Sequence, residues 1–255
     1  MTQNKFLLLM TVLMAMHFAG TDARAADTRC YEMRTYYSPP GKLDELHARF
    51  RNHTLKLFEK HGIQNVGYWV PVENPDQKLI YILSYPSREA REKSWQAFVA
   101  DPAWQAASKE SEKNGKLVAK AESLFMSAVD YSPPVAPTAS STPRLFELRT
   151  YATPPGKLAD LNARFRDHTL KLFSKYGMTN VGYWTPMTDQ KAADTTLIYI
   201  LAHKDQAARD ASFAAFRTDA DWVKAKADSE KGGSLTLPDG VKFVMMKPTD
   251  YSPLR

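Results

Sequence analysis

Polar and mainly apolar side chains alternate along residues 30–37, which is the pattern of a β-strand with two unlike faces. The same alternation returns near residue 150. The polar faces of the two segments hold Glu32, Arg34 and Tyr36, and Glu147, Arg149 and Tyr151. Charged side chains are costly to bury without partners. We therefore expect these faces to point away from the helix layer.

A longer period follows the first strand, because apolar positions recur every three or four residues between Leu43 and His61. On a helix they form one stripe about 100° wide, and His53 lies at its edge. The opposite face carries Arg49, which follows Glu45 by four residues, the favourable order for a helical ion pair. This pairing predicts a solvated face rather than a nucleic-acid-binding stripe.

The remaining pattern of this region predicts three more strands and two more helices. β-branched and aromatic residues are concentrated at 63–72 and 78–85, which we expect to be strands. Helices are expected at 87–99 and 103–114, and a last strand at about 120–130. The order β-α-β-β-α-β is the split βαβ unit of ferredoxin-like α+β domains.

The whole pattern occurs twice. Residues 41–71 return as residues 156–186, with 22 of 31 aligned positions identical. Both copies end in Asp-Tyr-Ser-Pro, and the repeated unit is the size of a domain, so the chain is a tandem duplication. The expected divisions are domain one at 29–131, a Pro/Ser/Thr-rich linker at 132–144 and domain two at 145–252.

Residues 1–25 predict a signal peptide. Lys5 precedes an apolar run at 6–20 that is short for a membrane span, and small residues surround a cleavage position between Ala25 and Ala26. An uncleaved anchor helix is the alternative. With cleavage, the chain would be periplasmic or secreted and would keep no stable membrane span.

Composition limits the remaining possibilities. The formal net charge is +6, and the single cysteine, Cys30, excludes an internal disulfide. Packing must therefore provide the stability, and 44% hydrophobic residues suffice for two cores. The chain has no His-x-x-x-His pair, no cysteine cluster and no Gly-rich phosphate loop, so we predict no metal site.

Three repeated motifs resemble the NIPSNAP family: the Arg-Thr-Tyr strand before Pro-Pro-Gly-Lys-Leu, the helix ARFRxHTxKLF and the strand Asn-Val-Gly-Tyr-Trp. The resemblance covers both domains. It implies the dimeric α/β-barrel superfamily, in which two ferredoxin-like sheets face each other. Here both sheets would come from one chain, as an internal pseudo-dimer that could associate further into a homo-oligomer. Relatives in that superfamily include cofactor-independent monooxygenases, haem-dependent peroxidases and ligand-binding modules.

In such a barrel the polar strand faces would meet the lumen or its rim. Two interpretations of Arg34 and Arg149 stay open. Each closes the barrel as a structural ion pair with Glu32 or Glu147, or each holds an anionic ligand.

His53 and His168 recur at the edge of the helix stripe. The first interpretation is a buried neutral imidazole bonded to a backbone carbonyl or a tyrosine hydroxyl, and the alternative is a general base or haem ligand. Tyr36 and Tyr151 complete the catalytic candidates.

Aromatic pairs recur in the second strand of each domain, as Tyr68-Trp69 and Tyr183-Trp184. They are expected to serve as core and interface aromatics, or to form the wall of an apolar ligand cavity.

The sequence leaves two function classes open. The first is a binding or interaction module for a small organic or anionic ligand, with no cofactor. The alternative is a cofactor-free or haem-dependent oxidoreductase of the monooxygenase-like kind, which rests on fold analogy.

Overall fold

The computed structural model describes residues 27–135, 137 and 142–255. In the first module the order of elements is the predicted β-α-β-β-α-β. The elements are β1 (Cys30–Tyr37), α1 (Leu43–Arg49), the π-helical segment η1 (Phe50–Thr54), α2 (Leu55–Lys60), β2 (Gln64–Pro71), β3 (Lys78–Tyr85), α3 (Arg88–Ala100), α4 (Pro102–Ser111) and β4 (Lys120–Ala128).

The second module repeats this order. Its elements are β5 (Leu145–Ala152), α5 (Leu158–Arg164), the π-helical segment η2 (Phe165–Thr169), α6 (Leu170–Lys175), β6 (Thr179–Pro186), β7 (Thr196–His203), α7 (Gln206–Thr218), α8 (Ala220–Ser229) and β8 (Val241–Pro248).

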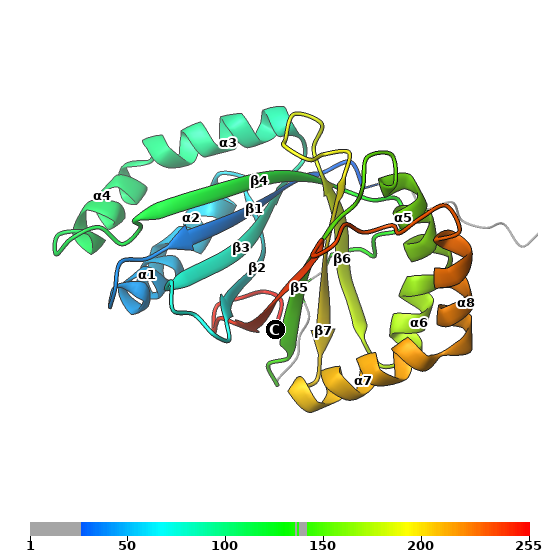
Figure 1. Ribbon diagram of the computed structural model, residues 1–255. Helices are drawn as coiled ribbons and strands as arrows, with labels where there is room; N and C mark the ends of the chain where they lie inside the picture. The colour runs from blue at the N-terminus through cyan, green and yellow to red at the C-terminus, as the bar shows by residue number, and fades with distance from the viewer. Residues whose placement is uncertain (1–26, 136, 138–141) are drawn as a thin grey trace, which may run out of the picture.

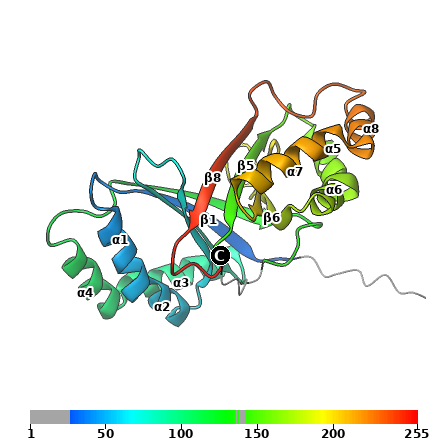
Figure 2. The ribbon, with the colours of Figure 1, turned by 90° about the horizontal axis from the view of Figure 1, so that it is seen from below.

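The strands of the described chain close one antiparallel barrel in the order β1-β3-β2-β8-β5-β7-β6-β4. The modules meet at two short seams, where β2 pairs with β8 and β4 with β6. The helices of each module cover the outside of that module's own sheet (Figures 1 and 2). The predicted internal pseudo-dimer is confirmed.

Apolar side chains from both modules fill the barrel interior. Tyr31 contacts Trp184 across the barrel and Phe146 contacts Trp69, with ring centroids 5.6 Å and 5.5 Å apart. All four side chains are buried. Each module therefore depends on the other to cover this surface.

The polar face of β1 points to the helices and not to the barrel interior, so the predicted orientation is wrong. Arg34 lies on Trp95 of α3, with its Cζ atom 4.4 Å from the ring centroid. Glu32 accepts two hydrogen bonds from Arg91 of the same helix, at 2.8 Å and 2.9 Å. Strand alternation fixes which residues share a face but not what covers that face. Here α3 supplies the countercharge that makes burial of Glu32 tolerable.

The π-helical segment η1 shifts the buried stripe of the first helical region. Thr54 donates a hydrogen bond to the carbonyl of Arg49, five residues earlier, at 3.2 Å. The wide turn adds one residue, so the following side chains change their angular position on the helix. Thr54 and Phe58 are buried. His53, which a regular period would place at the edge of the apolar stripe, is exposed.

Arg49 is also misplaced by the simple period, because it is 5% exposed rather than solvated. Helix α4 packs beside Arg49, and the guanidinium of Arg49 donates a hydrogen bond to Glu112 at 2.9 Å. The predicted partner Glu45 instead pairs with Lys42. In the second module Arg164 likewise bonds Glu230, at 2.8 Å.

The Asn-Val-Gly-Tyr-Trp motif has a packing reason in both modules. A Cβ atom on Gly67 would lie 2.3 Å from the indole of Trp69, and one on Gly182 would lie 2.4 Å from Trp184. Only glycine leaves room for these rings in the barrel interior.

The Asp-Tyr-Ser-Pro ends form what we call the cross-module clasp, in which the end of each module binds the other. Asp250 forms a two-bond ion pair with Arg51, at 2.6 Å and 2.7 Å, and Ser252 accepts a hydrogen bond from the backbone N–H of Tyr68. The first module makes the same contacts through Asp130 with Arg166 and Ser132 with Tyr183.

The predicted signal peptide and part of the predicted linker lie outside the described residues. Within the described ranges, every helix is too short or too polar to cross a membrane.

Candidate functional site

A cavity of about 300 Å³ lies between the sheet of the second module and helices α7 and α8. We call it the second-module cavity. Basic and aromatic side chains dominate its wall. They include Arg149, Arg164, Arg217, Lys226, Glu230, Tyr151, Phe165, Phe173, Phe213, Phe216 and Trp222.

Arg149 reaches this cavity from β5 and is 8% exposed. It donates hydrogen bonds to Glu147 and to the hydroxyl of Tyr151, the latter at 3.1 Å. Its Nε–H finds no acceptor among the described residues. Burial disfavours the charge, but Tyr199, Tyr151 and Glu147 outweigh it and hold the pKa of Arg149 above its usual value.

Glu147 is fully buried and binds two guanidinium groups. Arg209 of α7 donates to it at 2.8 Å and 3.1 Å, in addition to Arg149, and His203 Nε2 lies 3.2 Å from its Oε2. Burial alone would raise the pKa of Glu147, but the bonds to His203 and Arg209 and the charge of Arg149 lower it to about 2. One carboxylate therefore serves two arginines.

The other cations of the cavity are less completely paired. Arg164 bonds Glu230, and its Cζ lies 5.3 Å from the ring centroid of Trp222. Arg217 and Lys226 form no ion pair with any described residue. The wall thus holds four cations and one carboxylate. Such a surplus favours a negatively charged occupant.

The NIPSNAP family model matches residues 31–133 and again 146–253, which together make up most of the chain. The chain belongs to the NIPSNAP family. None of the curated proteins compared with it matches significantly.

Three solved structures are similar to this NIPSNAP protein. A NIPSNAP-like domain protein of uncharacterised function from Burkholderia xenovorans is 18% identical, with a TM-score of 0.39 over 45% of this chain and 97% of its own. A protein from Lactobacillus acidophilus, provisionally assigned as a monooxygenase, is 8% identical with a TM-score of 0.56, over 87% of this chain and 94% of its own. Another such protein, from Fusobacterium nucleatum, is 10% identical with a TM-score of 0.57, over 87% and 92%. The last two share the fold across both modules.

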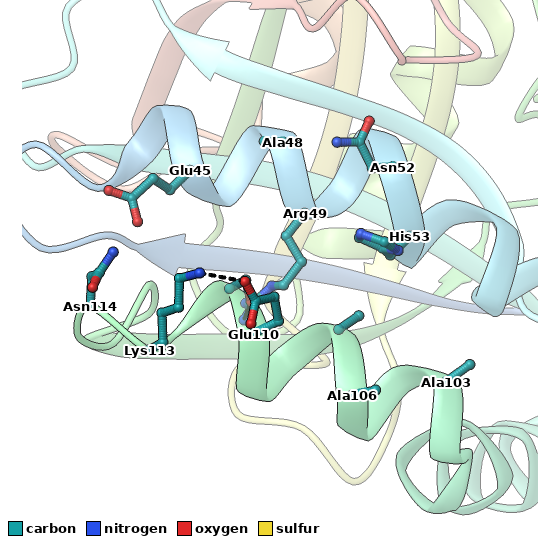
Figure 3. A pocket seen from close by; sticks show the side chains of 12 residues that line it. Glu45, Ala48, Arg49, Asn52, His53, Ala103, Ala106, Glu110, Lys113 and Asn114 are labelled. Carbon is teal, nitrogen blue, oxygen red and sulfur yellow. Dashed lines mark hydrogen bonds and ion pairs between the residues drawn. The ribbon is translucent and has the colours of Figure 1, made fainter.

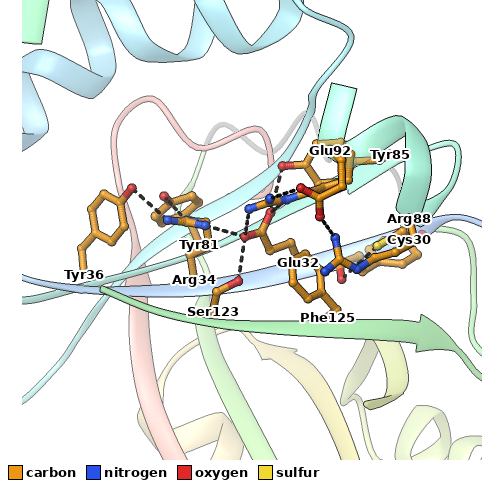
Figure 4. Close-up of polar contacts among 12 residues, drawn as sticks. Cys30, Glu32, Arg34, Tyr36, Tyr81, Tyr85, Arg88, Glu92, Ser123 and Phe125 are labelled. Atoms are coloured by element: carbon orange, nitrogen blue, oxygen red, sulfur yellow. Dashed lines mark hydrogen bonds and ion pairs between the residues drawn. The ribbon is translucent and has the colours of Figure 1, made fainter. Parts of the chain in front are cut away.

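The first module of this NIPSNAP protein carries different side chains at the corresponding positions. Trp95 stands where the second module has Phe213, and its larger ring covers Arg34. The Nε–H of Arg34 donates to the hydroxyl of Tyr81 at 2.9 Å, so each of the three guanidinium nitrogens of Arg34 donates a hydrogen bond (Figure 4). Val99 and Ser108 stand at the positions of Arg217 and Lys226.

The buried carboxylate of the first module, Glu32, accepts more hydrogen bonds than Glu147 does. Glu32 is bonded by Arg34, Arg91, the hydroxyl of Tyr85 at 3.0 Å and that of Ser123 at 2.7 Å (Figure 4). Burial opposes its charge, but these partners lower the pKa of Glu32. The structural ion pair is therefore present in both modules, under the helices rather than in the lumen.

His53 and His168 are exposed on the outer helical surface, so the predicted buried imidazoles are wrong. His53 lines an open groove of about 640 Å³ between the first helical region and α4, beside Ala48 and Ala106 (Figure 3). His168 occupies the same place in the second module, in a groove with charged walls.

These positions do not suit a haem ligand inside the barrel. Both imidazoles are outside it, and packed rings occupy its interior. No cluster of three or more His, Cys, Asp or Glu side chains in the described ranges has the geometry of a metal site.

The repeated aromatic pairs belong to two layers. Trp69 and Trp184 fill the barrel interior, whereas Tyr68 and Tyr183 lie under the helices and stack on Tyr81 and Tyr199, with centroids 5.3 Å and 5.0 Å apart. Tyr36 and Tyr151 also lie on the helix side. None of the aromatic pairs lines the second-module cavity, whereas Tyr151 does.

Arg164, Arg217 and Lys226 are the site residues that sequence reasoning missed. Arg164 is the counterpart of Arg49, which was predicted to lie on a solvated helix face, and the other two lie outside the repeated motifs. The available signal was the comparison of the two copies, because Val99 and Ser108 are replaced by cations in the second copy.

Proposed function

We propose that this NIPSNAP protein is a small-molecule-binding module that takes its ligand in the second-module cavity. The observation that supports this function is the cavity itself, which has a volume of about 300 Å³ between sheet and helices and has Phe213 in its wall, where the first module has the larger Trp95. Its size is at the lower end of the usual range for ligand pockets, so the ligand is small.

The composition of the wall supports binding more than catalysis. Five aromatic rings of Phe and Trp offer apolar contact area, and Arg149 offers an unbonded N–H. Glu230, which could move a proton, is engaged by Arg164. The likeness to proteins provisionally assigned as monooxygenases concerns the fold, and at 8–10% identity it carries no residue roles. Oxygen consumption in the presence of a bound ligand would reveal the oxidoreductase alternative.

The test is to fill the cavity with the first module's own residue. Phe213→Trp places an indole where the first module has one, and Phe213→Leu keeps the space open as the matched control. A collection of small aromatic compounds, neutral and charged, is screened by thermal shift and then by calorimetry, because a ligand that binds the native state raises Tm.

We expect at least one compound to bind wild type and the Leu variant, and to lose binding to the Trp variant by about tenfold or more. Equal affinity of the Trp variant, or the absence of any binding compound, would contradict the proposed function.

We also propose that the chain is exported and processed near Ala26, on the grounds of the apolar run and small residues before that position. N-terminal sequencing of the exported fraction should then begin near Ala26. Recovery from the cytoplasm with Met1 intact would refute it.

A further inference from the structure

We propose that the ligand of the second-module cavity is an organic anion, whose charged group lies among Arg217, Lys226 and Arg164 and whose apolar part lies against Phe213. This inference rests on the proposed function and names its ligand class. It also assigns the selectivity to two side chains that sequence motifs do not mark.

The first support is the charge of the wall. Of the four cations that line it, Arg149 and Arg164 have carboxylate partners, whereas Arg217 and Lys226 have none among the described residues. The unpaired two come from α7 and α8, the two helices that cover the cavity. A carboxylate or phosphate ester placed between them would gain charge-assisted hydrogen bonds from both helices.

The second support is the surroundings of one ring. Three guanidinium groups lie around Phe213, with Cζ atoms 4.7 Å (Arg209), 5.0 Å (Arg149) and 5.6 Å (Arg217) from its centroid. Glu147 bonds Arg149 and Arg209, and Asp210 also bonds Arg209, at 3.0 Å, so Arg217 is the one of these three groups without a carboxylate partner among the described residues. Each cation gains from the ring, but together they repel one another. An anion beside the ring would relieve this repulsion.

The third support is the direction of divergence between the copies. From the first module to the second, the three positions change from Trp95, Val99 and Ser108 to the smaller ring of Phe213 and to two cations. All three changes open the space or add positive charge. If the cavity were only a difference in packing between the modules, the two added cations would have no role.

Matched probes of one shape separate charge from size. Benzoate and phenyl phosphate carry an anionic group, and benzamide is neutral. The full-length protein is titrated with each by calorimetry at low ionic strength. We expect both anions to bind about tenfold or more tightly than benzamide, since bonds to charged groups are the stronger ones.

The decisive variant is Arg217→Val/Lys226→Ser, which restores the first module's residues. Both side chains are exposed at the rim, so the fold should persist, which an unchanged Tm verifies. We expect the variant to lose the preference for benzoate and phenyl phosphate while its affinity for benzamide stays within about twofold. Arg217→Lys, which keeps the charge, should retain most of the preference.

Three outcomes discriminate between the ideas. Anion preference that disappears in the double variant supports the inference. Equal binding of benzamide and benzoate to wild type, abolished by Phe213→Trp, would overturn the anion assignment and leave the proposed binding function standing. Absence of binding by all three probes and by the screened compounds would overturn both.

A gain-of-function variant tests the same residues from the other side. Trp95→Phe/Val99→Arg/Ser108→Lys gives the first module the three side chains of the second. We expect a folded triple variant to bind a second equivalent of benzoate. A folded variant that still binds one equivalent would overturn the claim that these three positions set the site.

Discussion

The two modules share one scaffold and differ in one space. Both bury a Glu–Arg pair between strand and helix, both pack a tryptophan over a glycine, and both clasp the other module through Asp-Tyr-Ser-Pro. In the first module Trp95 of α3 lies on Arg34, whereas in the second the smaller Phe213 lines a cavity with cations around it. The duplication has kept the scaffold in both copies and left room for a ligand in one.

This difference shows where functional information lies in a duplicated chain. The stretch that is most nearly identical between copies, residues 41–71 and 156–186, contains the glycine, tryptophan and arginine positions that build the barrel and the clasp. The two unpaired cations of the second-module cavity, Arg217 and Lys226, lie on α7 and α8, where the copies have diverged. Repetition within the chain therefore marks architecture, and divergence marks the candidate site.

The largest expected effect comes from separating the modules. Residues 26–133 produced alone should aggregate or self-associate as a substitute dimer, because Tyr31 and Trp69 would be exposed with the rest of the barrel interior. Size-exclusion chromatography with light scattering, beside the full chain, measures this. A folded, monomeric first module would show that the two halves do not depend on each other.

A smaller effect should distinguish the two buried arginines. Arg34→Met should cost about 3 kcal/mol, because Arg34 bonds Glu32 and Tyr81 and packs on Trp95. Arg149→Met should cost less, about 1 kcal/mol, because the Nε–H of Arg149 has no acceptor among the described residues and Glu147 keeps its bonds to Arg209 and His203.

Urea unfolding of both variants provides the comparison, and ligand-induced stabilisation provides the second readout. Equal losses in the two modules, with ligand stabilisation intact in Arg149→Met, would mean that both arginines are purely structural.

The pH dependence should follow the buried carboxylates. The pKa of Glu147 lies at about 2 in the folded protein against an ordinary value of 4.5, so its stabilisation is complete above 4.5 and is lost as pH falls toward 2. The loss should amount to about 3 kcal/mol for this group.

Glu147→Gln should be less stable at neutral pH and should show a shallower decline of unfolding free energy below pH 4.5. Glu32→Gln is the matched control in the first module, where the pKa is also lowered. A Glu147→Gln variant with the wild-type acid profile would exclude Glu147 as a source of that decline.

The smallest effect is expected at the clasp. Asp250→Asn and Asp130→Asn each break an exposed ion pair, with Arg51 or Arg166, so each should cost about 0.5 kcal/mol, less at high salt. Thermal melts at two salt concentrations test this. A loss of several kcal/mol from one variant alone would show that the two clasps are not equivalent.

The sequence by itself determined the duplication and the β-α-β-β-α-β order, and its resemblance to the NIPSNAP family implied the internal pseudo-dimer. The duplication and the element order follow from short-range periodicity, turn residues and repeated motifs, which depend on the chain near each position. Alternation along β1 also identified correctly that Glu32, Arg34 and Tyr36 share a face.

Only the tertiary structure decided which layer that face meets and where a ligand could lie. The alternation along a strand does not say which of its two faces meets the helices. In β1 that choice is made by α3, which brings Arg91 and Trp95 over the strand from about 60 residues away in the chain. The position of His53 required the π-helical turn at η1, a one-residue irregularity that a regular 3.6-residue period does not contain. The wall of the second-module cavity comes from β5, α5, α6, α7 and α8, and only the packing of these segments brings its residues together. Packing of distant segments, rather than local pattern, therefore placed the candidate site.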